Sequence, residues 1–318
     1  MTEPSEIKDK EEIAAKGNEN IHREAIERFN DIMDREQDSR ELGVEDARFA
    51  QTQDGMWADD TEEDTSPDVP KYTFNLVASA IDTIIGDQRQ NEISVRVRPA
   101  GDGADKEDAD TFNGLIKNIM AQSDFEAIHN NAFDETLNSG YGGMRVVTRF
   151  SRDDVNLNSF DQEACIEPIN SAVTSLFFGP SKKYDKSDAL YAFLVWNESL
   201  TDYRAKYPNA SVTDFDQDLY KKDGYQHWFD GNDIRLAEYW RKVPIKRKIA
   251  LVQYPPQPPM IKGRTEVIDL GEEKKVLDEL AMMGAQVLRT REINDWQVER
   301  YIMNGAEILS LLRSGRAN

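Results

Sequence analysis

The side chains best suited to chemistry are few in this sequence and lie far apart along it. His22, His129 and His227 fall in three separate stretches, and their spacing favours neither a shared metal ion nor a nucleophile and base pair. Cys165 is the one cysteine, so the chain can form no internal disulfide and no multi-cysteine zinc site. We therefore expect a small buried thiol, a reducing compartment, no metal and no cofactor.

Two short motifs imitate ligand sites without completing them. The glycine-rich SGYGG at 139–143 could cradle a phosphate, but it lacks the lysine of a P-loop and precedes a strand-like stretch. Asp230, Asn232 and Asp233 around Gly231 imitate part of a calcium loop, yet the glutamate ligand does not follow at its fixed position. We predict a structural turn for the first motif and a solvated loop for the second.

Recognisable enzyme motifs are absent from the sequence. It contains no Walker-type G-x-x-x-x-G-K-[ST], no G-x-S-x-G and no H-E-x-x-H. Carboxylates are so abundant that a pair resembling a nuclease or glycosidase site could be drawn by chance, so such pairs carry no weight. The sequence predicts a protein that is not an enzyme.

Basic residues gather in two places. Lys182, Lys183 and Lys186 share one loop, for which a solvated face is the prediction. A second cluster, which we name the basic cluster, comprises Arg241, Lys242, Lys246, Arg247 and Lys248. The chain carries a formal charge of −21, yet residues 234–318 carry about +4 and residues 1–70 about −14. We expect the basic cluster to dock a partner, with the wet face of a strand pair or contacts to acidic neighbouring subunits as alternatives.

The composition sets broader limits. A chain of 318 residues can bury one large core or two ordinary ones. Its acidity opposes tight, sequence-nonspecific binding of DNA by an isolated subunit, although DNA could slide past an acidic wall. The start, MTEPSEIKDKEEIAAK, lacks the apolar core of a signal peptide, and no stretch approaches the ~18 consecutive apolar residues of a membrane span. We expect a protein that neither enters nor crosses a membrane.

Hydrophobic periodicity predicts an α+β fold. Residues 1–20 are predicted to be a disordered arm, and a helix is expected from residue 21 to near Arg40, followed by an acidic loop over 51–70. A second helix should bury one apolar face, composed of Phe74, Val77, Ala78, Ile81, Ile84 and Ile85. The alternation of Ile93, Val95 and Val97 predicts a strand.

The remaining segments show either the helical period of 3.6 residues or the strand period of two residues. Helices are expected around 112–120, 125–137, 199–207 and 270–284. Strands are expected over 144–150, 164–170, 173–179, 189–197, 233–243, 246–255, 287–293 and 296–312, the last containing an Asn304-Gly305 hairpin signal. The polar segment 209–232 is a candidate boundary. We predict a helix-rich domain over 21–232 and a small α/β module over 233–318.

Several segments, in order, resemble one family. They are YTFNLVASAIDTIIGDQRQNEISVRVRPAG (72–101), AFDETLNSGYGGMRVVTRF (132–150) and ACIEPINSAVTSLFFGPSKKYDKSDALYAFLVWNESLTDYRAKYP (164–208). This order and spacing is similar to that of portal proteins of short-tailed, Salmonella-type bacteriophages. The resemblance extends over roughly residues 20–310.

The resemblance implies a structural role in the virion. It implies a dodecameric ring at one capsid vertex, with wing, stem and clip regions around a channel for double-stranded DNA, and with terminase, tail or adaptor, and capsid proteins as partners. Residues 21–232 would be wing-like and residues 233–318 clip-like. The protein would lie at the portal vertex, and in the host cytoplasm during assembly.

Members of that family are longer and continue into a second stem helix and a crown. Whether this chain is a fragment, a truncated gene or one piece of a split gene stays open, as does its ability to form a ring. A free-standing binding module derived from a portal gene is one alternative function. A phage-encoded hydrolase that uses carboxylates is the other.

Overall fold

The computed structural model describes residues 4–51, 74–91, 94–100, 105–150, 162–215, 233–255, 265–271 and 273–313. The helices in this part are α1 (Pro4–Gln51), α2 (Leu76–Gln90), α3 (Lys106–Gln122), α4 (Phe125–Ser139), α5 (Ala172–Ser175), α6 (Leu200–Lys206) and α7 (Glu273–Met282). The strands are β1 (Gly143–Phe150), β2 (Gln162–Ile169), β3 (Leu176–Phe178), β4 (Tyr191–Ser199), β5 (Asp233–Gln253), β6 (Thr265–Asp269), β7 (Gln286–Met303) and β8 (Ile308–Arg313). Helices and antiparallel sheets confirm the α+β class.

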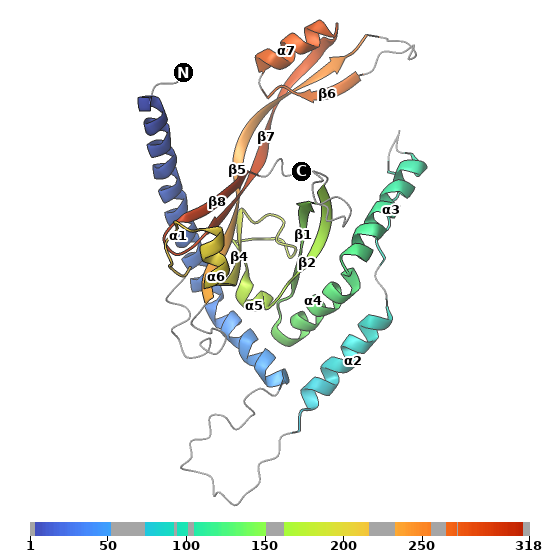
Figure 1. The fold of residues 1–318 in the computed structure, drawn as a ribbon. Coiled ribbons are helices and arrows are strands. Elements are labelled where there is room, and N and C mark those ends of the chain that lie inside the picture. Colours follow the sequence, from blue (N-terminus) through green and yellow to red (C-terminus); the bar gives the residue numbers. More distant parts are fainter. Residues whose placement is uncertain are drawn as a thin grey trace, which may run out of the picture.

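Two long strands organise the molecule. The main sheet has the order β3-β4-β5-β7-β8, with β6 paired to β5, and β1 pairs with β2 in a separate sheet. β5 and β7 run together from the broad body of the molecule to a small distal module made with β6 and α7 (Figure 1). We call the paired stretch between body and module the ribbon.

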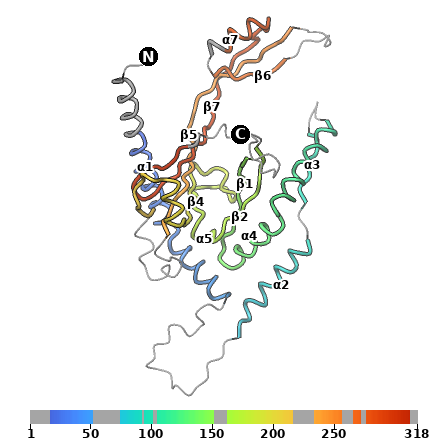
Figure 2. The backbone as a smooth tube through the Cα atoms, in the orientation of Figure 1, coloured from blue at the N-terminus to red at the C-terminus, as the bar shows by residue number. Residues whose placement is uncertain are grey.

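The core of the body lies between α1 and the main sheet. Ala25, Phe29, Ile32 and Met33 recur at helical spacing, so one face of α1 is apolar and packs on the sheet. The Phe29 ring makes edge contacts with Phe177, at 5.0 Å between ring centroids. Figure 2 shows that α1, near the start of the chain, runs beside β8, near its end. His22 Nε2 lies 2.9 Å from the carbonyl oxygen of Asn304 there, so the two distant segments are hydrogen-bonded.

The first helix is longer than the sequence predicted. It begins at Pro4, in the stretch expected to be a disordered arm, and continues past Arg40 to Gln51. Arg40 is 3% exposed and donates hydrogen bonds to the carbonyl oxygens of Val173 and Leu176. Beyond Arg40, Ala50 is 6% exposed and its carbonyl oxygen accepts from the Asn75 side chain at 2.7 Å. The periodicity of apolar residues does not reveal these contacts with distant segments.

The second helix is where expected, but the burial prediction for it is wrong. Only Ile85 of the predicted apolar face is buried, whereas Phe74 is 82%, Val77 40% and Ile84 48% exposed. Asn75 caps the helix by accepting from the backbone N–H of Ala78 at 2.8 Å. Periodicity identifies which face of a helix is apolar, but it does not show whether the same chain supplies a cover for that face.

The strand predicted from Val95 and Val97 does not form; residues 94–100 belong to no strand, and Ile93 lies outside the described residues. Asn113 of α3 takes the place of a neighbouring strand. Its side chain accepts from the Val97 N–H at 2.7 Å and donates to the Val97 carbonyl at 3.1 Å. One amide side chain thus satisfies both backbone groups that a strand partner would have paired.

Two further differences come from pairing between distant segments. The strands predicted over 233–243 and 246–255 are one strand, because Pro244 stands opposite Trp296 where β5 is paired on that one side. β7 likewise joins the stretch predicted over 287–293 to the first part of the stretch predicted over 296–312, and β8 forms the second part. The segment 173–179 is a strand only from Leu176, since α5 occupies its first residues.

The proposed boundary between the two domains lies inside a continuous sheet. Residue 233 is the first residue of β5, and β5 pairs with β4 from Asp233 to Arg241. Phe215, within the polar segment 209–232, is fully buried in the core of the body. The acidic loop up to Pro70 and residues 216–232 lie outside the described residues.

The hairpin signal at Asn304-Gly305 is confirmed. Asn304 is fully buried, and its side-chain oxygen accepts from the N–H groups of Ala306 and Glu307 at 2.8 and 2.7 Å. A Cβ atom on Gly305 would lie 2.1 Å from the carbonyl oxygen of Asp214, so only glycine fits this close approach.

Candidate functional site

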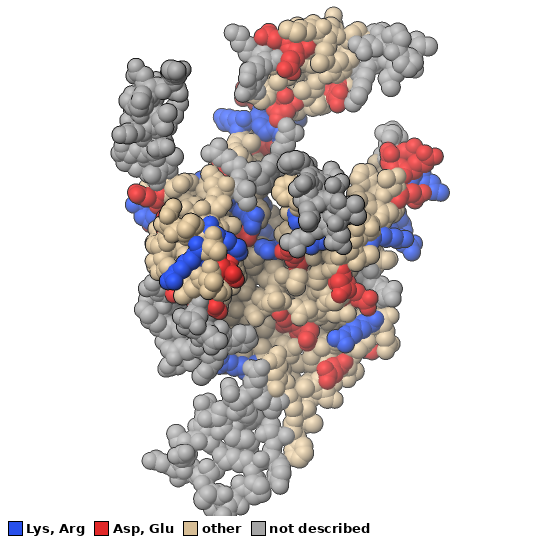
Figure 3. Space-filling model, in the orientation of Figure 1, with Lys and Arg blue, Asp and Glu red and all other residues tan. Residues whose placement is uncertain are grey.

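The basic cluster lies on the ribbon, and the structure divides it between two faces. Successive side chains of a strand point to opposite sides, so Arg241 and Arg247 share one face of β5, while Lys242, Lys246 and Lys248 share the other. Basic side chains gather on the ribbon below the distal module (Figure 3). The five residues that the sequence groups together are therefore not one surface.

Arg241 fastens α1 to the sheet. Its guanidinium lies 2.7 Å from Glu299 and 3.1 Å from Glu24 of α1. Tyr301 donates to Glu299 at 2.7 Å, and burial together with this hydrogen bond raises the pKa of Tyr301 to about 12. The neighbouring Tyr239 hydroxyl contacts Glu24, and burial raises its pKa as well. Arg241 thus belongs to an internal network of ion pairs and hydrogen bonds.

Arg247 is also engaged within the chain. It forms ion pairs with Asp295 of β7 and Asp269 of β6, and these hydrogen bonds raise the pKa of its guanidinium. Its charge is offset by two carboxylates, so it joins the ribbon to β6. Structural roles for Arg241 and Arg247 follow from these contacts.

Of the five residues of the cluster, Lys246 is the most accessible. Lys246 is exposed, and Trp296, which stands opposite Pro244, is 41% exposed. Lys242 donates from Nζ to the carbonyl oxygen of Ser187 at 2.8 Å, which ties the ribbon to the loop that holds the other lysines. Lys248 is half-buried.

That loop, residues 181–188, is held in shape by Asp188. The Asp188 carboxylate accepts from Ser181 Oγ at 2.6 Å and from the Lys182 N–H at 2.8 Å, and these bonds hold its pKa well below the usual range. Lys182, Lys183 and Lys186 are exposed, as expected of a solvated face. Tyr184 among them is 98% exposed, a feature that the count of charges did not single out.

His22 and His129 lie on two different helices, as their sequence positions indicated. His22 contacts the Asn304 carbonyl, His129 Nδ1 lies 3.1 Å from the Gln88 amide, and His227 lies outside the described residues. Cys165 is buried. Among the described residues, no three His, Cys, Asp or Glu side chains are grouped so that they could hold a metal ion.

The two ligand-like motifs have different outcomes. Gly140 of SGYGG ends α4 with a φ of 76°, a left-handed conformation that favours glycine, and its N–H donates to Thr136 at 2.9 Å. This confirms the structural turn. Asp233 starts β5, while Asp230, Gly231 and Asn232 lie outside the described residues.

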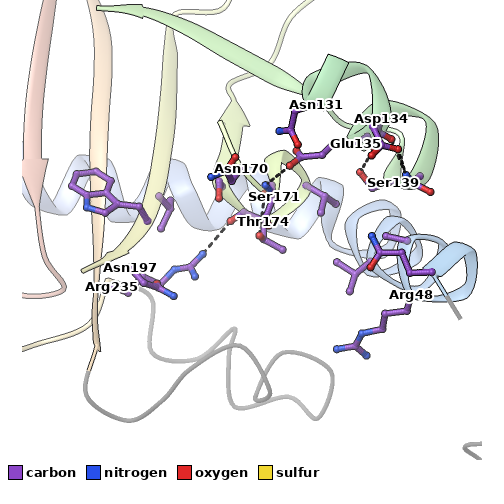
Figure 4. A pocket seen from close by; sticks show the side chains of 18 residues that line it. Arg48, Asn131, Asp134, Glu135, Ser139, Asn170, Ser171, Thr174, Asn197 and Arg235 are labelled. Atoms are coloured by element: carbon purple, nitrogen blue, oxygen red, sulfur yellow. Dashed lines mark hydrogen bonds between the residues drawn. The ribbon is translucent and has the colours of Figure 1, made fainter. Parts of the chain in front are cut away.

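A cavity of about 420 Å³ opens beside the C-terminal end of α1, against α4, α5, β4 and β5 (Figure 4). Polar groups at its wall hold α5 in place. Glu135 accepts from the N–H groups of Ser171 and Ala172 at 2.9 and 3.0 Å, and Arg235 donates to the Thr174 carbonyl at 3.2 Å. Carboxylates and guanidiniums line it together, so the wall selects neither an anion nor a cation, and it presents no nucleophile beside a base.

The helices of the described ranges include none with the length and apolar character needed to span a bilayer.

Comparison with known proteins agrees with this geometry. The sequence pattern of the Phage P22-like portal protein family matches residues 26–314. A protein of Acyrthosiphon pisum secondary endosymbiont phage 1, named "Portal protein", is 28% identical over 299 residues. That match spans 91% of this chain and 40% of the length of the relative. Since the family pattern extends over nearly the whole chain, the chain belongs to the Phage P22-like portal protein family, a structural class of phage protein.

Proposed function

We propose that the chain is a structural subunit of a portal ring that conducts double-stranded DNA during packaging of the phage genome and during its ejection. The family match over residues 26–314 carries this proposal. The ring would be dodecameric and would lie at one vertex of the capsid, having assembled in the host cytoplasm. Terminase, tail or adaptor, and capsid proteins would be its partners.

The shape of the chain supports several separate contacts. A broad body and a small distal module stand at the two ends of the ribbon (Figure 1). Surfaces so far apart can serve different partners without competition. The net charge of −21 suits a wall that DNA passes without being retained, because phosphate groups are repelled by carboxylates.

The basic cluster is proposed to contribute to docking at the distal end. Lys246 and its neighbours Lys242 and Lys248 would supply the attraction, and the arginines would keep the ribbon in shape. Opposite charges across an interface accelerate encounter and set specificity more than they raise affinity. The docking contribution should therefore weaken as salt is added.

Size-exclusion chromatography with light scattering, followed by electron microscopy, tests the ring. A mass of many subunits and ring-shaped particles are the expected result. A monomer at all concentrations would contradict the proposal and favour a binding module derived from a portal gene.

A further inference from the structure

The distal module has one covered face and one open face. Its three-stranded sheet has the order β6-β5-β7, and α7 packs on one side of it. Ala250 and Val252 of β5 are fully buried beneath α7 together with Leu280 of that helix. Because side chains alternate along a strand, Ile249 and Leu251 point to the opposite side.

The open face combines apolar and basic groups. A shallow groove on it is lined by Ile249, Leu251, Val267, Arg289, Thr290 and Arg291. Val267 is 60% exposed, and no element of the described part of the chain covers it. Arg289 and Arg291 are both exposed, and the described side chains include no ion-pair partner for either. This face therefore carries uncompensated positive charge around an apolar strip.

The described second half of α7 carries exposed acidic side chains. Asp278 and Glu279 are exposed, and acidic side chains lie over this helix in Figure 3. Met282, the last residue of α7, is 87% exposed, and Met283 after it is 57% exposed. Exposed apolar side chains rimmed by charge are typical of surfaces that bind another protein.

We propose that the open sheet face of one copy packs against the outer face of α7 of the next copy. Val267 and Leu251 would meet Met282 and Met283, while Arg289 and Arg291 would lie near Asp278 and Glu279. Two complementary patches on opposite sides of one thin module make a head-to-tail contact. Such a contact repeats around a ring when the rotation between copies closes.

This proposal rests on the proposed function, because it assigns the contact between neighbouring copies of a ring. We propose a second copy of the chain as the partner because the open sheet face and α7 are complementary in charge and in apolar surface. Burial of the methionines and Val267 would stabilise the contact, and the charges would set which faces meet.

Disulfide crosslinking tests the contact directly. The Val267→Cys and Met282→Cys substitutions are combined in one chain, in which Cys165, the one native cysteine, is 3% exposed and does not compete. Mild oxidation of the assembled chain should give a ladder of covalent multimers on a non-reducing gel. Each single variant should give no ladder, and neither should the control pair Val146→Cys with Met282→Cys, since Val146 is 72% exposed on β1.

A charge swap gives an independent readout. Arg289→Glu with Arg291→Glu should raise the concentration needed for half-assembly by about tenfold, and so should Asp278→Lys with Glu279→Lys. The chain that carries all four changes should recover assembly. Assembly should recover only if the two sites face each other. Variants that had lost their fold would not recover when combined.

The outcomes separate this contact from the ring itself. Rings of the unmodified chain that give no ladder from the cysteine pair would overturn the contact while leaving the proposed function standing. A chain with all four charge substitutions that assembles no better than either double variant would also overturn the proposed contact. A chain that stays monomeric without any substitution would overturn the proposed function, and the contact with it.

Discussion

Arg40 of α1 donates a hydrogen bond to the carbonyl oxygen of Leu176 at 2.9 Å, although 136 residues separate the two. The same guanidinium pairs with Glu36 at 2.7 Å and lies 4.0 Å from the centroid of the Phe177 ring. It thus holds the C-terminal half of α1 against the start of β3.

Replacement of Arg40 by alanine should therefore destabilise the body. Arg40→Ala leaves the carbonyls of Val173 and Leu176 without this donor, and we expect a loss of about 2–4 kcal/mol in the free energy of unfolding. Urea denaturation measures it. The matched control is Arg35→Ala in the same helix, whose pair with Asp31 is half exposed and should contribute much less to the free energy of unfolding. Equal effects of the two variants would contradict the role of Arg40.

The aromatic core should depend on Phe29. Phe29 is 2% exposed and contacts the rings of Phe177, Phe193 and Phe215, so Phe29→Ala should lower the free energy of unfolding by about 3–5 kcal/mol. Phe74→Ala, at a position that is 82% exposed, should change it by about 0.5 kcal/mol or less in the isolated chain. A large loss at Phe74 under those conditions would mean that the apolar face of α2 is covered after all.

Alkaline pH should weaken the network around Arg241. The raised pKa of Tyr301, about 12, means that the folded state favours the neutral phenol. The contribution of the neutral Tyr301 phenol to the free energy of unfolding is fully present below about pH 10, the ordinary tyrosine pKa. It is lost as the pH rises to about 12. Tyr301→Phe should reduce the fall in stability between these values, as urea midpoints at a series of pH values would show. The fully exposed Tyr184 provides the control, and an identical effect of Tyr184→Phe would refute the assignment.

Docking through the ribbon should respond to a single charge. In a full-length portal ring, Lys246→Glu should slow binding of the packaging motor, more at low salt than at moderate salt, because exposed charges mainly alter association rates. Lys117→Glu, at another exposed lysine, on α3, should leave the rate unchanged. Binding at an unaltered rate in both salts would exclude the docking role. Failure of the rings to form would instead assign Lys246 to contacts between subunits.

The purified chain should neither hydrolyse ATP nor cleave DNA. The reason is the lack of a Walker motif in the sequence and of a nucleophile beside a base in the described cavity. Phosphate release and plasmid nicking assays measure both activities. Turnover that disappears when one carboxylate is replaced would overturn the structural assignment and revive the hydrolase alternative.

Local chemistry made part of this fold predictable. The helix α4, the glycine turn that ends it, the short helix α6 and the Asn304-Gly305 hairpin were all predicted correctly, because each depends on residues within a few positions of one another. The order of several segments along the sequence also indicated the family, and the family match over residues 26–314 confirms this prediction.

The secondary-structure predictions were wrong where the hydrogen-bonding partner of a segment belongs to another helix or strand. Val97 forms no strand because the Asn113 side chain takes both of its backbone groups, and Pro244 stays within β5 because β7 pairs on one side of it.

The sequence by itself determined the family, the α+β class and the identity of the charged and apolar residues. Only the tertiary structure decided which of them are available. Arg241 and Arg247 are held by carboxylates of other elements, whereas Lys246, Arg289 and Arg291 are exposed. The apolar face of α2 is likewise largely uncovered. The physical reason is that exposure and ion pairing depend on strand register and on packing between distant segments, which no local pattern of residues encodes.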